Sequence, residues 1–250
     1  MILNKLEPKF SKHHNPRIGL ITLGSDFRIE KDFNNVIYEK NIDLFVNRIH
    51  CHNPLSNKTL VKMAEDITNV TKEILPGQKL DCVAYGCTSG TVAAGYETIK
   101  SKVNLAKPDT KVTTPITSAI KAIRTLDIKK ISIFTPYTKM INDAVVNYFN
   151  KENIAINSLT YLNIASDLDI GKVDEDYLFE VLSKIDLKDS DALFVSCTAL
   201  PVLSIIDKLE KKIKKVVLSS NQTLIWDSLI EIKYKEKIEG FGKLFNSESI

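Results

Sequence analysis

The feature that most constrains the fold of this chain is an internal repeat. Short runs rich in β-branched residues alternate with longer helical patterns, which is typical of an α/β protein with parallel sheets. RIGLIT begins at Arg17, and a Cys-Thr pair follows 70 residues later at Cys87. KISIFT begins at Lys130, and a second Cys-Thr pair follows 67 residues later at Cys197. We therefore expect a duplicated βαβαβα unit that folds as two similar lobes related by a pseudo-two-fold axis.

Seven segments have the composition and length of strands, and helical patterns separate them. They are RIGLITL (17–23), IDLFVNRI (42–49), CVAYG (82–86), KKISIFT (129–135), AINSLTYLNI (155–164), ALFVS (192–196) and KVVLSS (215–220). We predict an α/β fold of two pseudo-symmetric lobes. Each lobe is expected to be a mainly parallel sheet flanked by helices, with the active site in the cleft between them.

The boundary between the lobes is expected in a short connection, because no linker rich in Pro, Gly or Ser divides the chain. VTTPITSAIKAIRTL and VLSSNQTLIWDSLI each combine a strand end with a helix, one in each half. We place residues 1–114 and 220–250 in the first lobe and residues 115–219 in the second. The last helix then packs back on the first lobe, and the tail after Ile238 is expected to be a loop or a frayed end.

The composition narrows the classes of function. The chain has 250 residues, of which 44% are hydrophobic and 26% charged, which is ordinary for a soluble globular protein. A formal net charge of +3 is too small to indicate nucleic acid or an anionic membrane as a partner. No run approaches the roughly eighteen apolar residues of a membrane span, and the N-terminus lacks the apolar stretch of a secretory signal. We therefore expect a cytoplasmic protein with reduced thiols.

The two Cys-Thr turns are the strongest candidates for a reactive site. YGCTSG and VSCTAL each stand where an apolar strand ends and a helix is expected to begin. Ligands of open α/β sheets bind at this edge, and a helix N-terminus lowers the pKa of a thiol placed there. The residues that follow Cys87 and Cys197, among them Thr88, Ser89 and Thr198, offer N–H groups suited to binding a carboxylate.

The occurrence of two such cysteines outweighs the ordinary interpretation of either one alone. A single cysteine at a strand end is most often a core residue. Two at equivalent positions of a duplicated unit are brought to one cleft, where they face opposite sides of a substrate. That geometry suits proton removal from one face with return to the other, or attack on one carbon with protonation of its neighbour. We expect Cys87 and Cys197 to be the catalytic residues.

The other two cysteines carry weaker signals. Cys82 opens an apolar strand and is expected to be a core residue. Cys51 lies between His50 and His52, which invites interpretation as a metal site. Neighbouring residues of a strand point to opposite sides, so the three side chains cannot easily reach one ion. We predict no metal.

Polar residues at further strand ends complete the candidate site. Asp26 follows the first strand, where it either faces the cleft or caps a turn. Tyr137 occupies the equivalent turn of the second half and can donate a hydrogen bond to a carboxylate. Asn163 ends a strand at the level of both cysteines.

On GLITLGSD, YGCTSGT, FTPY, SCTALP and SSNQTLIWDSL, in that order, the chain resembles the aspartate/glutamate racemase superfamily. The closer branch is the one that contains maleate cis–trans isomerase, arylmalonate decarboxylase and the ectoine-utilization A protein. The resemblance covers nearly the whole chain. It implies two pseudo-symmetric α/β lobes with the site between them and no cofactor.

The resemblance also implies roles for individual residues. Cys87 and Cys197 would be the two thiols, Thr88, Ser89 and the backbone after Cys197 would bind a carboxylate, and Tyr137 and Asn163 match hydrogen-bonding positions of the maleate isomerase branch. In the decarboxylase a glycine stands at the position of Cys87, which argues against decarboxylation here. Asp26 departs from the maleate isomerases, which tend to carry an asparagine nearby. It could pair with a substrate ammonium, and it would repel a carboxylate unless it were neutralised.

The leading hypothesis is a cofactor-independent two-cysteine isomerase of a small carboxylate or dicarboxylate, similar to maleate cis–trans isomerase. In that reaction the Cys87 thiolate adds to an alkene carbon and Cys197 protonates its neighbour. The single bond then rotates and elimination gives fumarate. The alternatives are an amino-acid racemase or epimerase, with a connection to ectoine catabolism, and a non-enzymatic protein that binds a small carboxylate. We also expect a homo-oligomer, a dimer or a tetramer.

Overall fold

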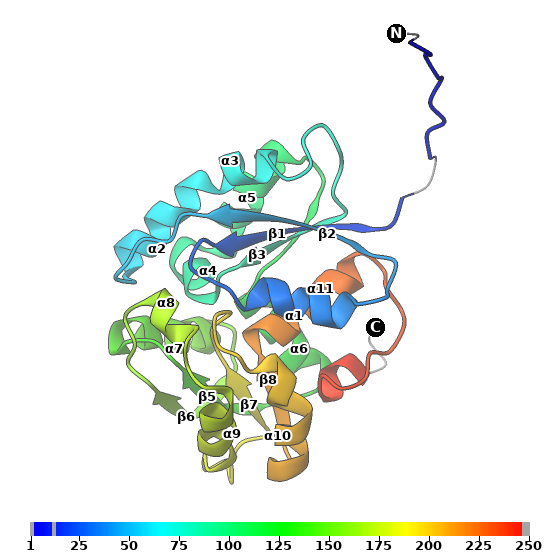
Figure 1. Ribbon diagram of the computed structural model, residues 1–250. Helices are drawn as coiled ribbons and strands as arrows, with labels where there is room; N and C mark the ends of the chain where they lie inside the picture. The colour runs from blue at the N-terminus through cyan, green and yellow to red at the C-terminus, as the bar shows by residue number, and fades with distance from the viewer. Residues whose placement is uncertain (1–2, 12–13, 247–250) are drawn as a thin grey trace.

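Two parallel sheets form the framework of the protein. The structure, a computed structural model, describes residues 3–11 and 14–246 (Figure 1). The first sheet comprises β1 (Arg17–Leu23), β2 (Asp43–Ile49), β3 (Cys82–Gly86) and β4 (Lys111–Thr113). The second comprises β5 (Lys130–Thr135), β6 (Ala155–Tyr161), β7 (Ala192–Val195) and β8 (Val216–Ser219). Their orders, β2-β1-β3-β4 and β6-β5-β7-β8, are the same when each half is counted from its first strand, which confirms the predicted fold.

Helices cover the sheets and connect their parallel strands. Those of the first half are α1 (Ile29–Ile37), α2 (Asn57–Met63), η1 (Ala64–Asp66), α3 (Ile67–Lys72), α4 (Thr88–Ala94) and α5 (Tyr96–Ala106). They are followed by α6 (Pro115–Thr125), α7 (Lys139–Lys151), α8 (Asp167–Ile170), α9 (Glu175–Ser183), η2 (Leu203–Ile205), α10 (Ile206–Ile213), α11 (Ser220–Glu231) and η3 (Lys243–Asn246). The central strands β1, β3, β5 and β7 are almost wholly buried, as their apolar sequences predict.

One strand is shorter than predicted. The segment 155–164 leaves the sheet after Tyr161, because Asn163 has a φ of +61°, a left-handed backbone that cannot continue a strand. The segment still runs beside the second sheet, since the N–H of Ile164 donates to the carbonyl of Pro136 at 2.8 Å.

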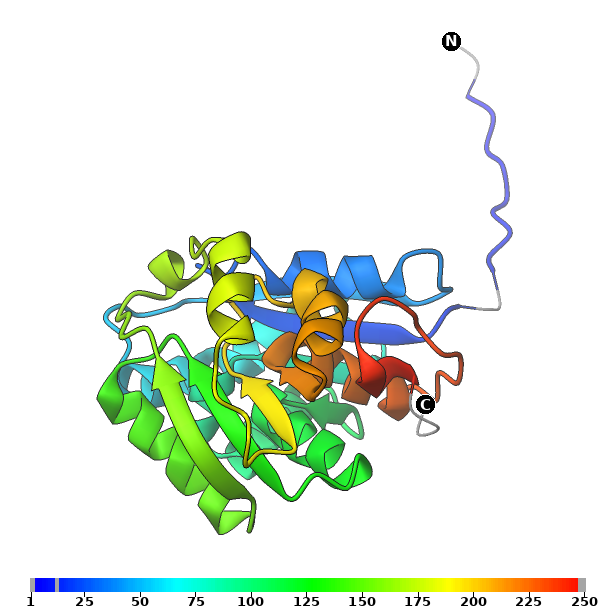
Figure 2. The ribbon, with the colours of Figure 1, turned by 90° about the horizontal axis from the view of Figure 1, so that it is seen from below.

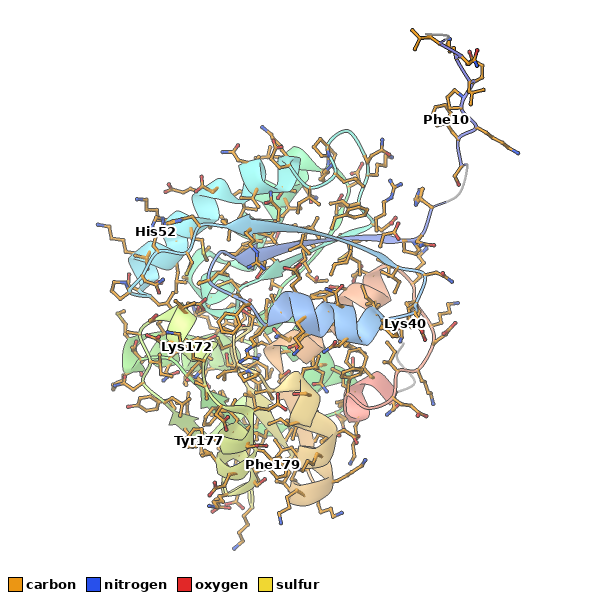
Figure 3. All side chains as sticks on the ribbon, in the orientation of Figure 1. Phe10, Lys40, His52, Lys172, Tyr177 and Phe179 are labelled. Atoms are coloured by element: carbon orange, nitrogen blue, oxygen red, sulfur yellow. The ribbon has the colours of Figure 1, made fainter. Side chains whose placement is uncertain are left out.

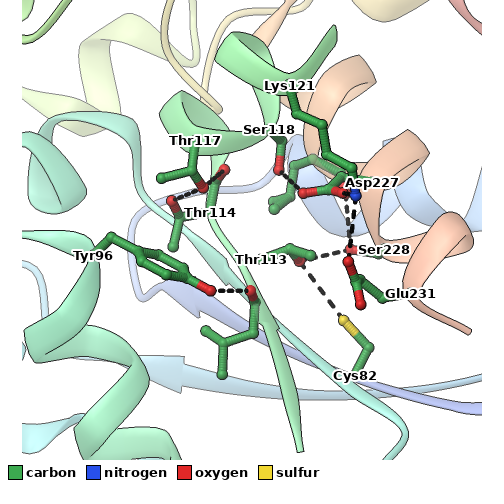
Figure 4. Close-up of polar contacts among 12 residues, drawn as sticks. Cys82, Tyr96, Thr113, Thr114, Thr117, Ser118, Lys121, Asp227, Ser228 and Glu231 are labelled. Atoms are coloured by element: carbon green, nitrogen blue, oxygen red, sulfur yellow. Dashed lines mark hydrogen bonds and ion pairs between the residues drawn. The ribbon is translucent and has the colours of Figure 1, made fainter. Parts of the chain in front are cut away.

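Helices α6 and α11 pack together between the two sheets (Figure 1). Although α11 follows β8, it also contacts β3 and β4 of the first sheet. Polar contacts tie α6, α11 and β4 together (Figure 4). Asp227 of α11 pairs with Lys121 and accepts a hydrogen bond from Ser118, both on α6. The division into residues 1–114 with 220–250 and residues 115–219 remains a prediction.

The same network accounts for Cys82. Its side chain is fully buried, as predicted, and its sulfur lies 3.7 Å from the hydroxyl of Thr113. That hydroxyl is in turn 2.8 Å from the hydroxyl of Ser228 on α11. Cys82 therefore belongs to the packing between β3, β4 and α11.

The C-terminal tail is packed, which corrects the expectation of a frayed end. Figure 2 shows the red C-terminal segment folded against the rest of the molecule. Leu244 and Phe245 are fully buried. Gln222 of α11 donates to the carbonyl of Phe241, and the N–H of Lys243 donates to the Glu210 carboxylate of α10. Two large apolar side chains thus make ordering of the tail favourable through residue 246. Residues 247–250 lie outside the described residues.

Residues 3–11 extend away from both sheets (Figure 1), and Phe10 in this segment is exposed (Figure 3). Across residues 3–11 and 14–246, no helix combines the length and apolar character that a membrane span needs.

Candidate active site

Cys87 stands at the end of β3, where α4 begins. It is the N-cap residue of α4, and its sulfur accepts a hydrogen bond from the N–H of Gly90 at 3.2 Å. The side chain is only 3% exposed. A Cβ atom at position 90 would lie 2.8 Å from the Cys87 sulfur, so glycine is required for this close approach.

Cys197 follows β7, but the helix expected after it does not begin there. The next helical segments are η2 and α10, which begin at Leu203 and Ile206. Cys197 has a φ of +104°, a conformation that L-residues rarely adopt, and Pro201 follows shortly after. The second Cys-Thr turn is therefore a strained loop. Such strain is held in place only by surrounding structure and is frequent at functional sites.

Hydrogen bonds bring the two turns together. The hydroxyl of Ser220, the first residue of α11, accepts hydrogen bonds from the Thr88 hydroxyl at 2.8 Å and from the N–H of Cys197 at 2.9 Å. The hydroxyl of Thr198 donates to the carbonyl of Gly86, the residue before Cys87, at 3.3 Å. Each Cys-Thr turn thus holds the other, and the meeting of the two turns agrees with the duplicated pattern of the sequence.

The hydroxyl side chains predicted to bind a carboxylate lie at this junction. Thr88, Ser89 and Thr198 are all nearly fully buried. The Ser89 hydroxyl is 3.8 Å from the Cys87 sulfur. Ser89 also lines an apolar cavity of about 360 Å³ together with Asn57, Leu60, Val92, Ala93, Met140, Ile141 and Ala144. The Ser89 side chain therefore lies between this cavity and the Cys87 thiol.

Two tyrosine hydroxyls flank the thiols, one for each cysteine. Tyr137 is 1% exposed, and its hydroxyl interacts with the Cys197 sulfur and lowers the pKa of that thiol. Tyr85, on β3, is fully buried beside Cys87. The sequence points to Tyr137 but not to Tyr85, because a tyrosine inside an apolar strand looks like an ordinary core residue. Burial raises the pKa of both phenols, so both remain hydrogen-bond donors.

Two buried carboxylates also lie near the thiols. Asp26 is 1% exposed, and its Oδ1 accepts hydrogen bonds from the N–H groups of Arg28 and Ile29. Asp167, at the start of α8, is 4% exposed and accepts a 2.6 Å hydrogen bond from the Ser25 hydroxyl. Burial raises the pKa of both carboxyls, that of Asp167 to about 6.

Asp167 is buried among the groups around the thiols, whereas Asn163 is not. The side chain of Asn163 is exposed, and the structure does not bring it among the buried groups around the thiols. Four residues further along, Asp167 turns inward, and its charge acts on both Cys87 and Cys197. The sequence signal for Asp167 is weak, because Ser166 and Asp167 look like the ordinary start of a short helix.

Burial dominates the pKa of both catalytic candidates. The loss of water around the sulfur raises the pKa of Cys87 and Cys197 above the ordinary thiol value, and the charge of Asp167 raises both further. The N–H of Gly90 lowers the pKa of Cys87, and the N–H of Ala199 and the Tyr137 hydroxyl lower that of Cys197, but these effects are smaller than the effect of burial. The expectation of a thiol pKa lowered by the helix terminus is therefore wrong for the net effect in this enclosed site.

Cys51 lies near the buried groups of the site, because the Ser25 hydroxyl interacts with its thiol and the charges of Asp167 and Asp26 act on it. The rings of His50 and His52 stack edge to face with centroids 4.5 Å apart, and Cys51 is partly buried. Arg48 donates to the carbonyls of Leu23 and Asp26 and pairs with Glu30, so it braces the loop that carries Asp26. In the described part of the chain, no group of three or more His, Cys, Asp or Glu side chains is arranged to hold a metal ion.

Comparisons with known proteins agree with this architecture. Residues 92–245 match the sequence model of the family described as arylmalonate decarboxylase. The maleate isomerase of Geobacillus stearothermophilus is 24% identical over 246 residues, which cover 93% of this chain and 98% of the relative. The maleate isomerase Iso of Pseudomonas putida S16 superposes with a TM-score of 0.86 at 21% identity, over 93% of this chain and 99% of that one.

A second solved structure is that of the Nocardia farcinica maleate cis–trans isomerase, a cysteine-to-serine mutant with a covalently bound succinylcysteine intermediate. It has a TM-score of 0.84 and 19% identity, and covers 92% of this chain and 98% of that one. At these identities the superpositions show a shared fold. The family match spans more than half of the chain. The chain therefore belongs to the arylmalonate decarboxylase family.

Proposed function

We propose that the protein is a cofactor-independent isomerase of a small carboxylate, with chemistry of the maleate cis–trans isomerase type. The observation that supports the proposal most is the junction of the two Cys-Thr turns, where the Thr88 hydroxyl and the N–H of Cys197 donate to the same Ser220 hydroxyl. The relatives named maleate isomerase support it, as does the succinylcysteine intermediate named for the Nocardia farcinica enzyme.

In the proposed reaction Cys87 is the nucleophile. Its thiolate adds to one alkene carbon, and Cys197 gives its proton to the neighbouring carbon, which leaves a single bond free to rotate. The Cys197 thiolate then takes the proton back, the bond between carbon and the Cys87 sulfur breaks, and the trans alkene leaves. Because burial raises the pKa of Cys87, the cycle begins when this thiol loses its proton on substrate binding, and the N–H of Gly90 then stabilises the thiolate.

The Ser89 hydroxyl and the backbone N–H groups of Thr88 and Thr198 would bind the substrate carboxylate. The Thr88 and Thr198 hydroxyls donate to Ser220 and Gly86 and so hold the junction, and the Tyr137 phenol interacts with Cys197. Within an enclosed site such hydrogen bonds act in a low dielectric and hold the alkene between the two sulfurs. Asn163 would take part only if its segment turned inward.

Racemisation is the second candidate, and the observation that favours it is the pair of buried carboxylates, Asp26 and Asp167. In that reaction one thiolate would take the α-proton of an amino acid, and the other thiol would return a proton to the opposite face. A passive binding protein is less well supported, because two thiols fixed at one junction serve no purpose in simple binding. A cytoplasmic location and a dimeric or tetrameric assembly are part of the proposal.

The test is a proton NMR time course in deuterated buffer. Maleate is offered in one tube and single amino acids in others, with wild type, Cys87→Ser, Cys197→Ser and, as a control, Cys82→Ser, a buried cysteine that packs on Thr113 away from the site. A fumarate signal that both site variants abolish and Cys82→Ser retains supports isomerisation. Loss of an α-proton signal with the same dependence supports racemisation. Turnover that survives in both Cys87→Ser and Cys197→Ser would overturn the two-thiol mechanism.

A further inference from the structure

We propose that Asp26 and Asp167 form a seat for a protonated amine, so that the small carboxylate taken by this site carries an ammonium group. The inference rests on the two-thiol site proposed above and adds the second charged group of its substrate. It is carried by the geometry of two buried carboxylates, one from the loop after β1 and one from the start of α8.

The two carboxylate oxygens of Asp26 have different surroundings. Its Oδ1 is held by the N–H groups of Arg28 at 2.8 Å and Ile29 at 3.1 Å, and so caps the start of α1. Its Oδ2 is buried and has no hydrogen-bond partner among the described residues. The Thr198 hydroxyl approaches this carboxyl closely enough to lower its pKa, but its proton is directed to the Gly86 carbonyl, and the carboxyl also lies close enough to Cys197 to act on its charge. A buried oxygen of this kind can accept a further hydrogen bond from a ligand.

Asp167 approaches the same place from the second half of the chain. Its Oδ2 accepts from the hydroxyl of Ser25, the neighbour of Asp26, and its backbone N–H donates to the Asn53 side chain at 3.2 Å. The N–H of Leu55 donates to the carbonyl of Ala165 in the same contact between halves. In Figure 3 these two segments can be found from the labels on His52, which precedes Asn53, and on Lys172, which follows α8. The hydrogen bond from Ser25 thus brings Asp167 to the residue next to Asp26, and the charges of the two carboxyls act on each other.

The cations nearby are engaged elsewhere. Arg48 donates hydrogen bonds to two backbone carbonyls and to Glu30. Arg28 donates from Nε and Nη2 to the carbonyl of Gly171. In the described ranges, no ion pair includes Asp26 or Asp167. Burial of unpaired carboxylates is unfavourable, and a cation between them relieves that penalty.

The chemical class of the substrate follows from this charge pattern. The Ser89 hydroxyl and the backbone N–H groups of Thr88 and Thr198 suit a carboxylate, while an unaccompanied dianion would meet the carboxyls of Asp26 and Asp167 beside Cys197. An ammonium has three donors and can satisfy Asp26 Oδ2 and Asp167 together. An amino-substituted carboxylate therefore complements the site on both sides, and an amine-free dicarboxylate complements only one.

The experiment compares ligands that differ only in the amine. Calorimetric titration of the full-length protein uses three matched pairs, succinate with aspartate, glutarate with glutamate, and butyrate with 2-aminobutyrate. We expect at least one amine-bearing member to bind tenfold or more tightly than its amine-free partner. Asp26→Asn and Asp167→Asn should each reduce that ratio by tenfold or more. Asp169→Asn, an exposed aspartate of the same helix paired with Lys172, is the matched control and should leave the ratio unchanged.

Amine-free members that bind as tightly as their partners in all three pairs would overturn the proposal, as would a ratio unchanged in both site variants. If Asp167→Asn does not fold, Ser25→Ala replaces it, because it removes the hydrogen bond that orients Asp167. The cysteine variants separate the two proposals. An amine preference without thiol-dependent turnover supports the seat and contradicts the proposed function, whereas thiol-dependent turnover of maleate without an amine preference does the reverse.

Discussion

The hydroxyl of Thr198 donates a hydrogen bond to the backbone carbonyl of Gly86 at 3.3 Å. Gly86 is the last residue of β3 and precedes Cys87, whereas Thr198 follows Cys197. The contact therefore joins the strand end of one half directly to the cysteine turn of the other. Since the distance between the thiols depends on how the two turns meet, this hydrogen bond should matter more for catalysis than for stability.

Replacement of Thr198 by valine tests this. Valine keeps the shape of the side chain but leaves the Gly86 carbonyl without its donor. We expect kcat to fall by about 10- to 100-fold, with a loss of about 1–2 kcal/mol in the free energy of unfolding. Thr71→Val is the control, because Thr71 is an equally buried threonine of α3 that donates to the carbonyl of Ile67, away from the site. Equal effects of the two variants on kcat would contradict the assignment.

A methyl group at Gly90 should disable the first thiol. The added Cβ would lie 2.8 Å from the Cys87 sulfur and 2.9 Å from the Tyr85 hydroxyl, so both must move. We expect Gly90→Ala to lower kcat by about 100-fold and to destabilise the fold by about 1–3 kcal/mol. At Gly24 the nearest atom to an added Cβ is 3.5 Å away, an ordinary contact, and Gly24→Ala should unfold like wild type. Full activity in Gly90→Ala would rule out a fixed Cys87 geometry.

The framework of the protein could be predicted because its signals are local. Apolar strand runs at matching intervals define two sheets of the same order, and each Cys-Thr pair stands at a strand end. Ser220 and Asp167 escaped prediction because their roles depend on tertiary contacts. Ser220 reaches the site only because α11 packs back between the sheets, and Asp167 only because residues 162–171 contact the other half. Nothing in the local sequence of either residue reports such contacts.

The loop at Cys197 differs in conformation from the equivalent turn at Cys87. Equivalent Cys-Thr motifs predict equivalent helix starts, yet only Cys87 caps a helix. Because of Pro201 and the positive φ of Cys197, no helix begins directly after Cys197, and the next helical segments are η2 and α10. The repeat therefore predicts the position of the second thiol correctly but not its backbone conformation.

The order in which the four thiols are alkylated tests the effect of burial. Burial raises the pKa of Cys51 to about 11 and that of the fully buried Cys82 to about 12, and it raises those of Cys87 and Cys197 strongly. Cys51 alone among them is partly exposed. We expect iodoacetamide at pH 8 to modify Cys51 first, as read by peptide mass spectrometry, and the other three at least tenfold more slowly. Faster labelling of Cys87 or Cys197 without substrate would mean that a thiolate is already formed in the resting site.

Asp32 is a half-buried residue of α1, and its carboxylate accepts a 2.7 Å hydrogen bond from the side chain of Asn221. Burial raises the pKa of Asp32 to about 7, above its ordinary value of 3.8. Between pH 4 and 7 the folded protein therefore holds a proton that the unfolded chain has released. The contribution of Asp32 to stability is thus full below pH 4 and is lost as the pH rises through 7.

We expect the free energy of unfolding of the wild type to fall by about 1–2 kcal/mol between pH 4 and 8 because of Asp32, and we expect this fall to be absent in Asp32→Asn. The fall is smaller than full burial would give, because the carboxylate is partly hydrated. Urea unfolding of both proteins across this range measures the difference. Asp66→Asn, at an exposed aspartate of η1, is the control and should follow the wild-type curve. Buried Asp26 and Asp167 contribute with the same sign in all three proteins. Because the charge of Asp26 acts on Asp32, the difference between the curves reports on Asp32 together with its coupling to Asp26. Parallel curves for wild type and Asp32→Asn would show that this carboxyl keeps its ordinary pKa in the folded state.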